Sequence, residues 1–134
     1  MKKFKDEVQN NLFGIGEKNQ YGEFFTGQSY LKTLLDSPDT DLLMANVSFE
    51  PGCRNNWHAH NDYQILVGIA GEGFYQIDGQ AKKVLHPGEV VVIPKNTKHW
   101  HGATDDSWFC HLAIMKKSAK TTWGDPVTDD EYLA

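Results

Sequence analysis

The sequence predicts an all-β fold, either a sandwich or a closed barrel, in a single domain of 134 residues. Short runs of apolar and β-branched residues alternate with turns rich in Gly, Pro, Asn and Asp along most of the chain. This spacing is typical of antiparallel β-structure. The helical period is weak in the middle of the chain. Internal repeats, low-complexity tracts and interdomain linkers are not visible, so we expect one domain over 1–134.

The expected strands follow one another at short intervals along the chain. The first lies over 28–35 and ends at the turn SPDTD, and the second lies over 42–50 and ends at Pro51-Gly52. Further strands are expected over 63–70, 74–78, 81–85, 89–94 and 107–115, each bounded by turn residues. Near the end, Thr128 and Glu131 have the spacing of a capping box and predict a short helix. The polar first twenty residues are expected to wrap the barrel edge or a neighbouring subunit.

Composition limits the partners that we expect for the chain. A net charge of −5 and a pI near 5.6, without a basic patch, argue against binding to nucleic acid. A membrane span needs roughly 18 apolar residues, and neither such a run nor a secretory signal is visible. Cys53 and Cys110 lack the spacing of a disulfide framework, so we expect two free thiols and a cytoplasmic protein.

Two pairs of histidines carry most of the chemical information. His58 and His60 lie one residue apart, so on a strand both face one way, and Gln64 joins them if the strand is unbroken. His99 and His101 form the second pair. Imidazoles inside a barrel are costly unless they form hydrogen bonds or bind a metal. One pair is more often incidental, but two pairs after glycine-bounded turns favour a divalent first-row metal with three nitrogen ligands and one oxygen ligand.

The spacing of these residues resembles the two motifs of the cupin superfamily. Gly52, His58-Ala59-His60, Gln64 and Gly71 have the spacing of the first motif, and Gly88, Pro94, Asn96 and His99 that of the second. The chain departs from the motifs where Gln64 replaces the usual glutamate, Asn96 the usual glycine, and Ala103 a frequent asparagine. Asparagine tolerates a left-handed turn almost as glycine does. The resemblance implies a double-stranded β-helix, the jelly-roll barrel, with its core over about 40–116.

A narrower resemblance covers most of the chain. The segments FFTGQSYLKTL, NVSFEPG, KHWHGATDDSWFCHLAI and WGDPVTDDEY are similar to small one-domain bacterial cupins related to carboxymuconolactone decarboxylase. That group includes the manganese-dependent hydroxynitrile lyases. The resemblance implies a metal bound by His58, His60, Gln64 and His99, a pocket lined by Ala45 and Val47, and a catalytic base at His111.

Alternation leaves several orientations open. If His111 faces the barrel interior, Met115 faces the same pocket, and the opposite face of the strand is unusually apolar. That face, formed by Trp108, Cys110, Leu112 and Ile114, would then indicate a subunit interface in a homodimer or homotetramer. Otherwise His111 lies at the surface and the apolar row lies in the core. His101 is either a base beside the metal or a hydrogen-bonded wall residue, and Gln64 either binds the metal or only forms hydrogen bonds.

The functional hypothesis combines what the resemblance implies with the charge of the site. With Gln64 as a ligand the site stays formally dicationic, which strengthens the metal as a Lewis acid and attracts anionic groups. We expect one divalent metal ion per chain, manganese first and then iron, zinc or nickel. The substrate is expected to be a small hydroxylated or carboxylated molecule, cleaved by a non-oxidative lyase in which His111, or less readily His101, takes a hydroxyl proton. The alternatives are a metal-dependent dioxygenase and a non-catalytic binding protein.

Overall fold

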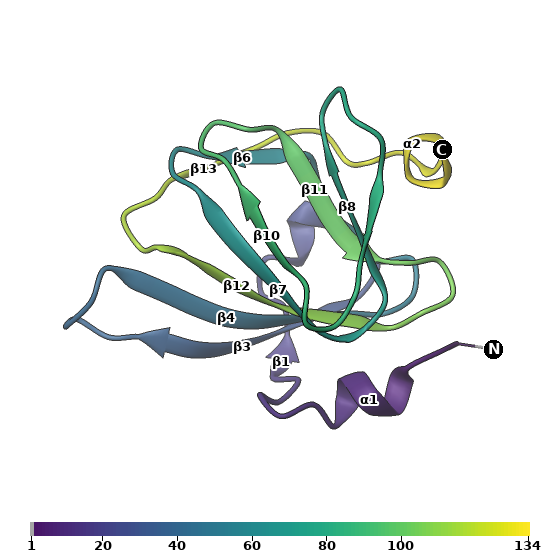
Figure 1. Cartoon of the computed structure of the whole chain (residues 1–134), viewed down its shortest axis with the longest axis horizontal. Coiled ribbons are helices and arrows are strands. Elements are labelled where there is room, and N and C mark those ends of the chain that lie inside the picture. Colours follow the sequence, from purple (N-terminus) through teal and green to yellow (C-terminus); the bar gives the residue numbers. More distant parts are fainter. Residues whose placement is uncertain (1) are drawn as a thin grey trace.

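The computed structural model describes residues 2–134, so Met1 of the predicted domain lies outside the described residues. Its strands form two antiparallel sheets that close into a jelly-roll barrel (Figure 1). The first sheet has the order β1 (Glu17–Lys18), β3 (Ser29–Asp36), β4 (Leu42–Phe49), β12 (Phe109–Lys116), β7 (Gln64–Gly71) and β10 (Val90–Ile93). The second has the order β13 (Thr121–Trp123), β6 (His58–His60), β11 (His99–Ala103), β5 (Arg54–Asn55) and β2 (Phe25–Thr26). On this second sheet β8 (Gly73–Ile77) also pairs with β11, and β9 (Lys83–Leu85) pairs with β8.

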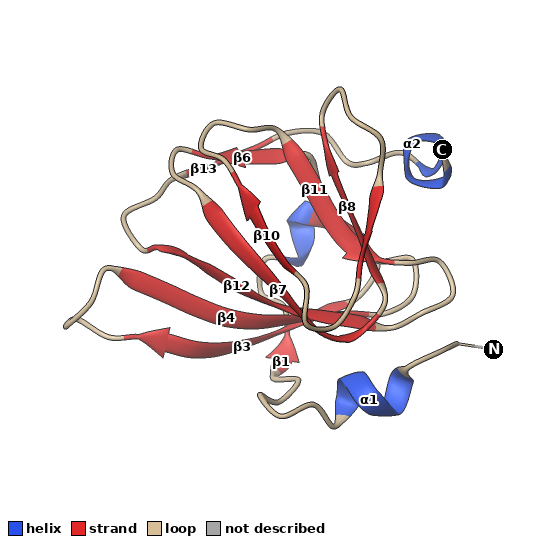
Figure 2. Cartoon of the chain, viewed as in Figure 1, coloured by secondary structure: helices blue, strands red, loops and turns tan. Residues whose placement is uncertain are grey.

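Three short helices accompany the strands over residues 2–134 (Figure 2). They are α1 (Lys5–Gln9), the 3-10 helix η1 (Gly22–Phe24) and α2 (Asp129–Leu133). The capping box predicted for α2 is present, because Thr128 Oγ1 accepts from the Glu131 N–H at 3.1 Å and Glu131 Oε1 accepts from the Thr128 N–H at 3.0 Å. Within the described residues, no helix is long and apolar enough to cross a membrane.

The predicted all-β fold is confirmed, and each of the seven expected strands is present with ends shifted by no more than two residues. Sequence reasoning missed β1, β2, β5 and β13, which have only two or three residues each. Runs that short carry no alternation, so they cannot be distinguished from loop by pattern.

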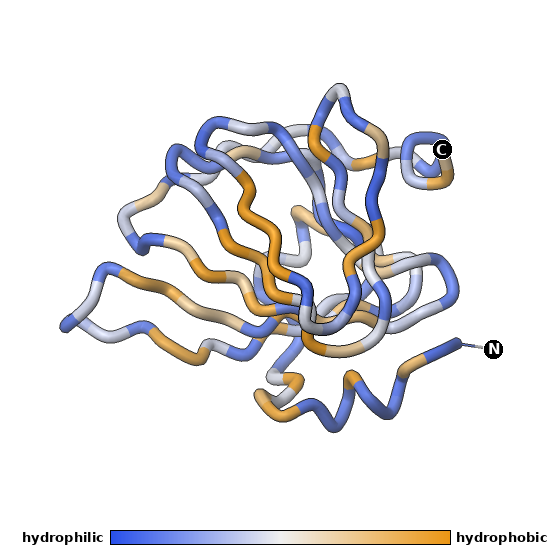
Figure 3. The backbone as a smooth tube through the Cα atoms, viewed as in Figure 1, coloured by the Kyte–Doolittle hydropathy of each residue, from blue (hydrophilic) through white to orange (hydrophobic). Residues whose placement is uncertain are grey.

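The barrel core lies between the two sheets, and β4 and β12, which pair along their full length, contribute much of it (Figure 1). Phe49 stands opposite Phe109 and Val47 opposite His111, so alternate residues of both strands point inward. Phe49, Phe109 and His111 are fully buried. Figure 3 shows apolar residues concentrated along β4, β7, β10 and β12. Of the two orientations left open for the strand over 107–115, the protein adopts the one with His111 inside.

The N-terminal segment covers part of the outer face of this sheet. Val8 of α1 forms a buried cluster with Trp108 and Cys110, and Ile15 packs against the same cluster. Within residues 2–20, the expected wrapping segment therefore packs on its own barrel through Val8 and Ile15. At Trp108 and Cys110 the apolar face of the 107–115 strand is covered by the same chain, so these two residues do not argue for a subunit interface. Both cysteines, Cys53 and Cys110, are buried free thiols.

The C-terminal segment covers the outer side of β11. Trp100 points away from the barrel interior, yet it is fully buried, because Trp57, Val127 and Tyr132 pack around it. The buried Arg54 side chain donates to the Val127 carbonyl at 2.7 Å and lies 4.4 Å from the Tyr132 ring centroid. The tail of the chain is thus fixed against the strand that carries His99 and His101.

Candidate metal centre

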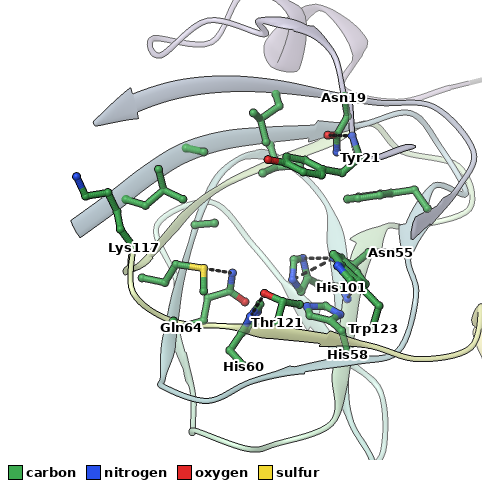
Figure 4. A pocket seen from close by; sticks show the side chains of 18 of the residues that line it. Asn19, Tyr21, Asn55, His58, His60, Gln64, His101, Lys117, Thr121 and Trp123 are labelled. Carbon is green, nitrogen blue, oxygen red and sulfur yellow. Dashed lines mark hydrogen bonds between the residues drawn. The ribbon is translucent and has the colours of Figure 1, made fainter. Parts of the chain in front are cut away.

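Three histidines from two paired strands converge at one end of the barrel. His58 and His60 come from β6, and His99 of β11 is the register partner of His58. One side-chain nitrogen from each of the three lies within 4.8 Å of the others, and all three residues are buried. Pairing of β6 with β11 therefore brings together histidines that are about forty positions apart in sequence. Figure 4 shows His58 and His60 side by side at the cavity wall.

The hydrogen bonds of His58 and His99 leave their Nε2 atoms free for a metal. Nδ1 of His58 donates to the Asn56 carbonyl at 2.8 Å, and Nδ1 of His99 donates to the Thr97 carbonyl at 2.8 Å. A carbonyl oxygen can only accept, so in each neutral ring the proton is on Nδ1 and the lone pair is on Nε2. The third ring, His60, has a buried Nε2 with no hydrogen-bond partner.

Gln64, the first residue of β7, turns its amide oxygen toward these rings. Its Oε1 lies 3.4 Å from Nε2 of His99, while its Nε2 points to Sδ of Met115 at 3.8 Å. Two buried atoms that carry lone pairs thus face each other, an arrangement that is costly unless a cation lies between them. Together with the unpartnered Nε2 of His60, this donor set fits a divalent first-row metal ion.

Burial keeps the three imidazoles neutral. It is the largest cause that lowers the pKa of His58, His60 and His99, the last to about 4. Neighbouring imidazoles lower the pKa of His58 and His99 further. Neutral imidazole is the form that binds a metal, so the site does not need to lose protons at neutral pH.

A second histidine pair lies beside the cluster. Nδ1 of His111 lies 3.1 Å from the Leu112 carbonyl, which can only accept, so Nε2 of His111 accepts from Nδ1 of His101 at 2.9 Å. The lone pair of His101 is then on Nε2, which lies 3.2 Å from the amide nitrogen of Asn55. Asn55 is held in turn by the backbone N–H of His101, which donates to its Oδ1 at 2.9 Å. This chain of hydrogen bonds fixes the tautomer of His101.

A cavity of about 390 Å³ opens onto these groups. His58, His60, Gln64, Asn55 and His101 form its polar end (Figure 4). The three residues predicted to form the pocket, Ala45, Val47 and Met115, all lie on its walls, and their contact with a substrate stays a prediction. His111 is fully buried behind His101 and does not line the cavity. Among the described residues that line it, none is Asp or Glu, so the cavity contributes no negative charge.

Sequence reasoning missed the cavity residues that come from the two ends of the chain. Tyr21 and Phe25 from the N-terminal side and Thr121 and Trp123 from β13 line the cavity. The Phe24 ring stacks on Trp123 with centroids 4.4 Å apart and planes 3° apart. The only sequence signal was the resemblance of the segments FFTGQ and WGDP, which contain Phe25 and Trp123 but not Tyr21 or Thr121, and a resemblance carries no geometry.

Comparison with known proteins agrees with the fold. The Cupin domain model matches residues 45–115. The chain is 40% identical over 113 residues to (R)-mandelonitrile lyase from Granulicella tundricola, covering 82% of this chain and 86% of the lyase. A crystal structure of a cupin-like protein from Thermotoga maritima is similar with a TM-score of 0.86 and 37% identity, covering 92% of this chain and 95% of that one. Acireductone dioxygenase from Bacillus cereus is 28% identical over 83 residues, covering 59% of this chain and 45% of the dioxygenase. The chain therefore belongs to the cupin superfamily, as its two motifs predicted.

Proposed function

We propose that this protein is a metal-dependent lyase that cleaves a small hydroxylated molecule of the cyanohydrin type. The observation that carries the proposal is the facing pair of buried acceptors, Gln64 Oε1 and His99 Nε2, since Gln64 lines the same cavity as His101. The relative from Granulicella tundricola is named (R)-mandelonitrile lyase, and its match covers most of both chains. We infer one divalent ion per chain, manganese first and then iron, zinc or nickel, bound by His58, His60, Gln64 and His99.

The residues around the cavity suit such a substrate. A metal ion at this position supplies Lewis-acid stabilisation of a substrate oxygen. The cavity volume of about 390 Å³ is in the range of small-molecule sites. Apolar side chains such as Phe25, Val47 and Ala113 form the walls and exclude water from the organic part of the substrate. Because no acid lines the cavity in the described part of the chain, a departing anion meets no negative charge there.

In the proposed reaction, His101 accepts the hydroxyl proton of the cyanohydrin at Nε2. The O–H electron pair forms the carbonyl double bond while the bond between the carbinol carbon and the nitrile carbon breaks. The electrons of that bond leave with cyanide, which takes the proton back from His101, so the products are an aldehyde and hydrogen cyanide. His111 accepts the Nδ1–H of His101 and keeps the lone pair of His101 on Nε2.

This proposal reverses the order of the two bases that the sequence predicted. His111 was the first choice, but it is fully buried and the cavity is lined by His101. A general base must come within hydrogen-bond reach of the proton that it abstracts. His111 is therefore proposed as a positioning residue for His101.

Metal analysis and cyanohydrin cleavage test the proposal together. Protein purified without chelator or nickel resin should contain about one metal ion per chain, and a His58→Ala/His99→Ala variant should contain none. With the metal bound, cleavage of mandelonitrile is followed by the absorbance of benzaldehyde. His101→Ala should keep the metal and lose about 10²- to 10⁴-fold in kcat, the usual contribution of general acid–base catalysis. Full activity in His101→Ala would refute the base role, and no cleavage with any of the four metals would refute the lyase.

A dioxygenase is the second candidate, favoured by the match to acireductone dioxygenase over 59% of this chain. That reaction would consume oxygen with the iron-loaded protein, whereas cyanohydrin cleavage proceeds under argon. Oxygen uptake that depends on a substrate would move the assignment to the dioxygenase. Thermal stabilisation by a ligand without any product would indicate a binding protein instead.

A further inference from the structure

The short C-terminal strand β13 reaches the histidine cluster from outside the two cupin motifs. It pairs antiparallel with β6, so Thr121 stands opposite His60 and Trp123 opposite His58. Oγ1 of Thr121 lies 2.8 Å from Nδ1 of His60, and Figure 4 shows this contact at the cavity wall. His60 therefore differs from the other two histidines of the cluster, whose Nδ1 atoms donate to backbone carbonyls two residues earlier in the chain.

The hydroxyl of Thr121 is the hydrogen-bond partner of Nδ1 of His60, the ring nitrogen opposite the one that faces the histidine cluster. Nε2 of His60 is buried without a partner, and it carries a lone pair only when the ring proton is on Nδ1. Oγ1 of Thr121 can accept a hydrogen bond from Nδ1–H, so it is compatible with the tautomer that a metal requires and holds the ring in its orientation. Without the hydroxyl, Nδ1 would lose its only hydrogen-bond partner in the described structure, and the ring could turn or exchange its proton.

Packing on both sides keeps Thr121 in place. Trp123 stacks on Phe24 and lies with its ring centroid 4.8 Å from that of His58. After the strand, the N–H of Gly124 donates to the Trp57 carbonyl at 2.7 Å. Before the strand, the N–H of Lys120 donates to Oδ1 of Asn61, the residue after His60, at 2.8 Å. These contacts on both sides of Thr121 fix the strand that carries it beside β6.

We propose that Thr121 is a positioning residue of the metal centre and that its hydroxyl orients His60 for metal binding. The C-terminal segment is then part of the metal site and not only a cover for the barrel. This inference rests on the proposed metal site, but it does not depend on the lyase reaction.

Three variants test the role of the hydroxyl. Thr121→Val removes it at nearly constant shape, Thr121→Ser keeps it, and Thr122→Val makes the same change one residue on, where the side chain is exposed and the register partner is Ala59. Affinities for Mn²⁺ and Co²⁺ are measured by competition with a chelator, and the visible spectrum of bound Co²⁺ reports the ligand geometry. Thr121→Val should bind both ions about 10- to 100-fold more weakly, the usual effect of losing a partner of a metal-binding histidine. Thr121→Ser and Thr122→Val should stay within about threefold of the unchanged protein and keep its Co²⁺ spectrum.

The outcomes separate this inference from the proposed function. If the unchanged protein binds neither ion, both the metal site and the role of Thr121 are refuted. If the unchanged protein binds the ions and Thr121→Val binds them as tightly, only the role of Thr121 is refuted. The same holds if Thr121→Ser binds the ions as weakly as Thr121→Val. Equal weakening by Thr122→Val would also refute it, because the effect would then come from the strand and not from the hydroxyl. Should Thr121→Val fail to fold, Thr121→Ala and Thr122→Ala form the matched pair.

Discussion

Burial of His111 should make the unfolding free energy of the metal-free protein fall as the pH falls. His111 is fully buried beside Phe49 and His101. Burial lowers its pKa from 6.5 to about 4, although its hydrogen bond to the Leu112 carbonyl acts in the opposite direction. In the unfolded chain the pKa returns to about 6.5, so the unfolded state binds a proton at a higher pH than the folded state. Protonation therefore favours unfolding.

The size of the effect follows from the two pKa values. The difference between 6.5 and about 4 corresponds to about 3 kcal/mol of unfolding free energy. This contribution is fully present above pH 6.5, is lost progressively as the pH falls toward 4, and is absent below 4. Between pH 7 and pH 5 the loss should be about 2 kcal/mol, a large part of the roughly 5–15 kcal/mol that stabilises a typical domain.

Urea unfolding in the presence of a chelator measures this loss at pH 7 and at pH 5. His111→Gln removes the buried imidazole, and His86→Gln removes an exposed one that lies in a turn. His58, His60 and His99 are present in both variants, so their effects largely cancel. His111 also lowers the pKa of His101, so its removal reduces the loss further in the same direction. The loss between the two pH values should be about 2 kcal/mol smaller in His111→Gln than in His86→Gln. Equal losses in the two variants would refute the reasoning from burial.

Three further predictions follow from the same structure. Phe49→Ala should lower the unfolding free energy by about 3–5 kcal/mol in urea titrations, because the fully buried ring leaves a cavity in the core; a change under about 1 kcal/mol would contradict its place there. Gln64→Glu should bind Mn²⁺ about tenfold more tightly in a chelator competition, because a carboxylate attracts the ion more than an amide oxygen does, and unchanged affinity would argue that residue 64 is not a ligand. We also propose that a second copy of the chain covers Val90 and Val92, which are 61% and 57% exposed on β10 and continue the apolar rows of β7 and β12. Val90→Lys with Val92→Lys should then reduce the mass measured by light scattering to that of one chain, and a single-chain mass before substitution would contradict the homo-oligomer.

The fold could be predicted from the sequence because its longer strands have a clear alternation. In β4, the inward Val47 and Phe49 alternate with the outward Asn46 and Ser48, and turn residues mark both ends of the strand. The surroundings of each outward face could not be predicted in the same way. Trp100 points out of the barrel but is buried by Val127 and the rest of the tail, a contact between distant parts of the chain that leaves no local pattern.

The candidate metal centre was partly predictable for a related reason. His58 and His60 lie two residues apart, and this even offset places both on one face of β6. The unbroken strand that would bring Gln64 to the same face is absent, because Gln64 begins β7 in the other sheet and reaches the cluster from there. Thr121 lies 61 residues after His60, and it reaches the site only because β13 pairs with β6. Alternation within a segment thus identifies the groups that can bind a metal, but the partners that orient them come from the pairing of distant strands.

The two remaining histidines show where spacing stops being informative. His101 and His111 both lie on inward faces, and nothing in their sequence positions tells which of them can accept a substrate proton. Their hydrogen bonds give the answer, because the Leu112 carbonyl requires a proton on Nδ1 of His111 and so directs the Nδ1–H of His101 toward its neighbour. Only Nε2 of His101 then keeps a lone pair at the cavity wall, beside an amide that can donate to it. If this reasoning is correct, His111→Asn should shift the pH dependence of mandelonitrile cleavage while retaining part of the activity. His101→Asn should abolish the cleavage activity itself. The reverse order of severity would make His111 the base and would refute the assignment drawn from the hydrogen bonds.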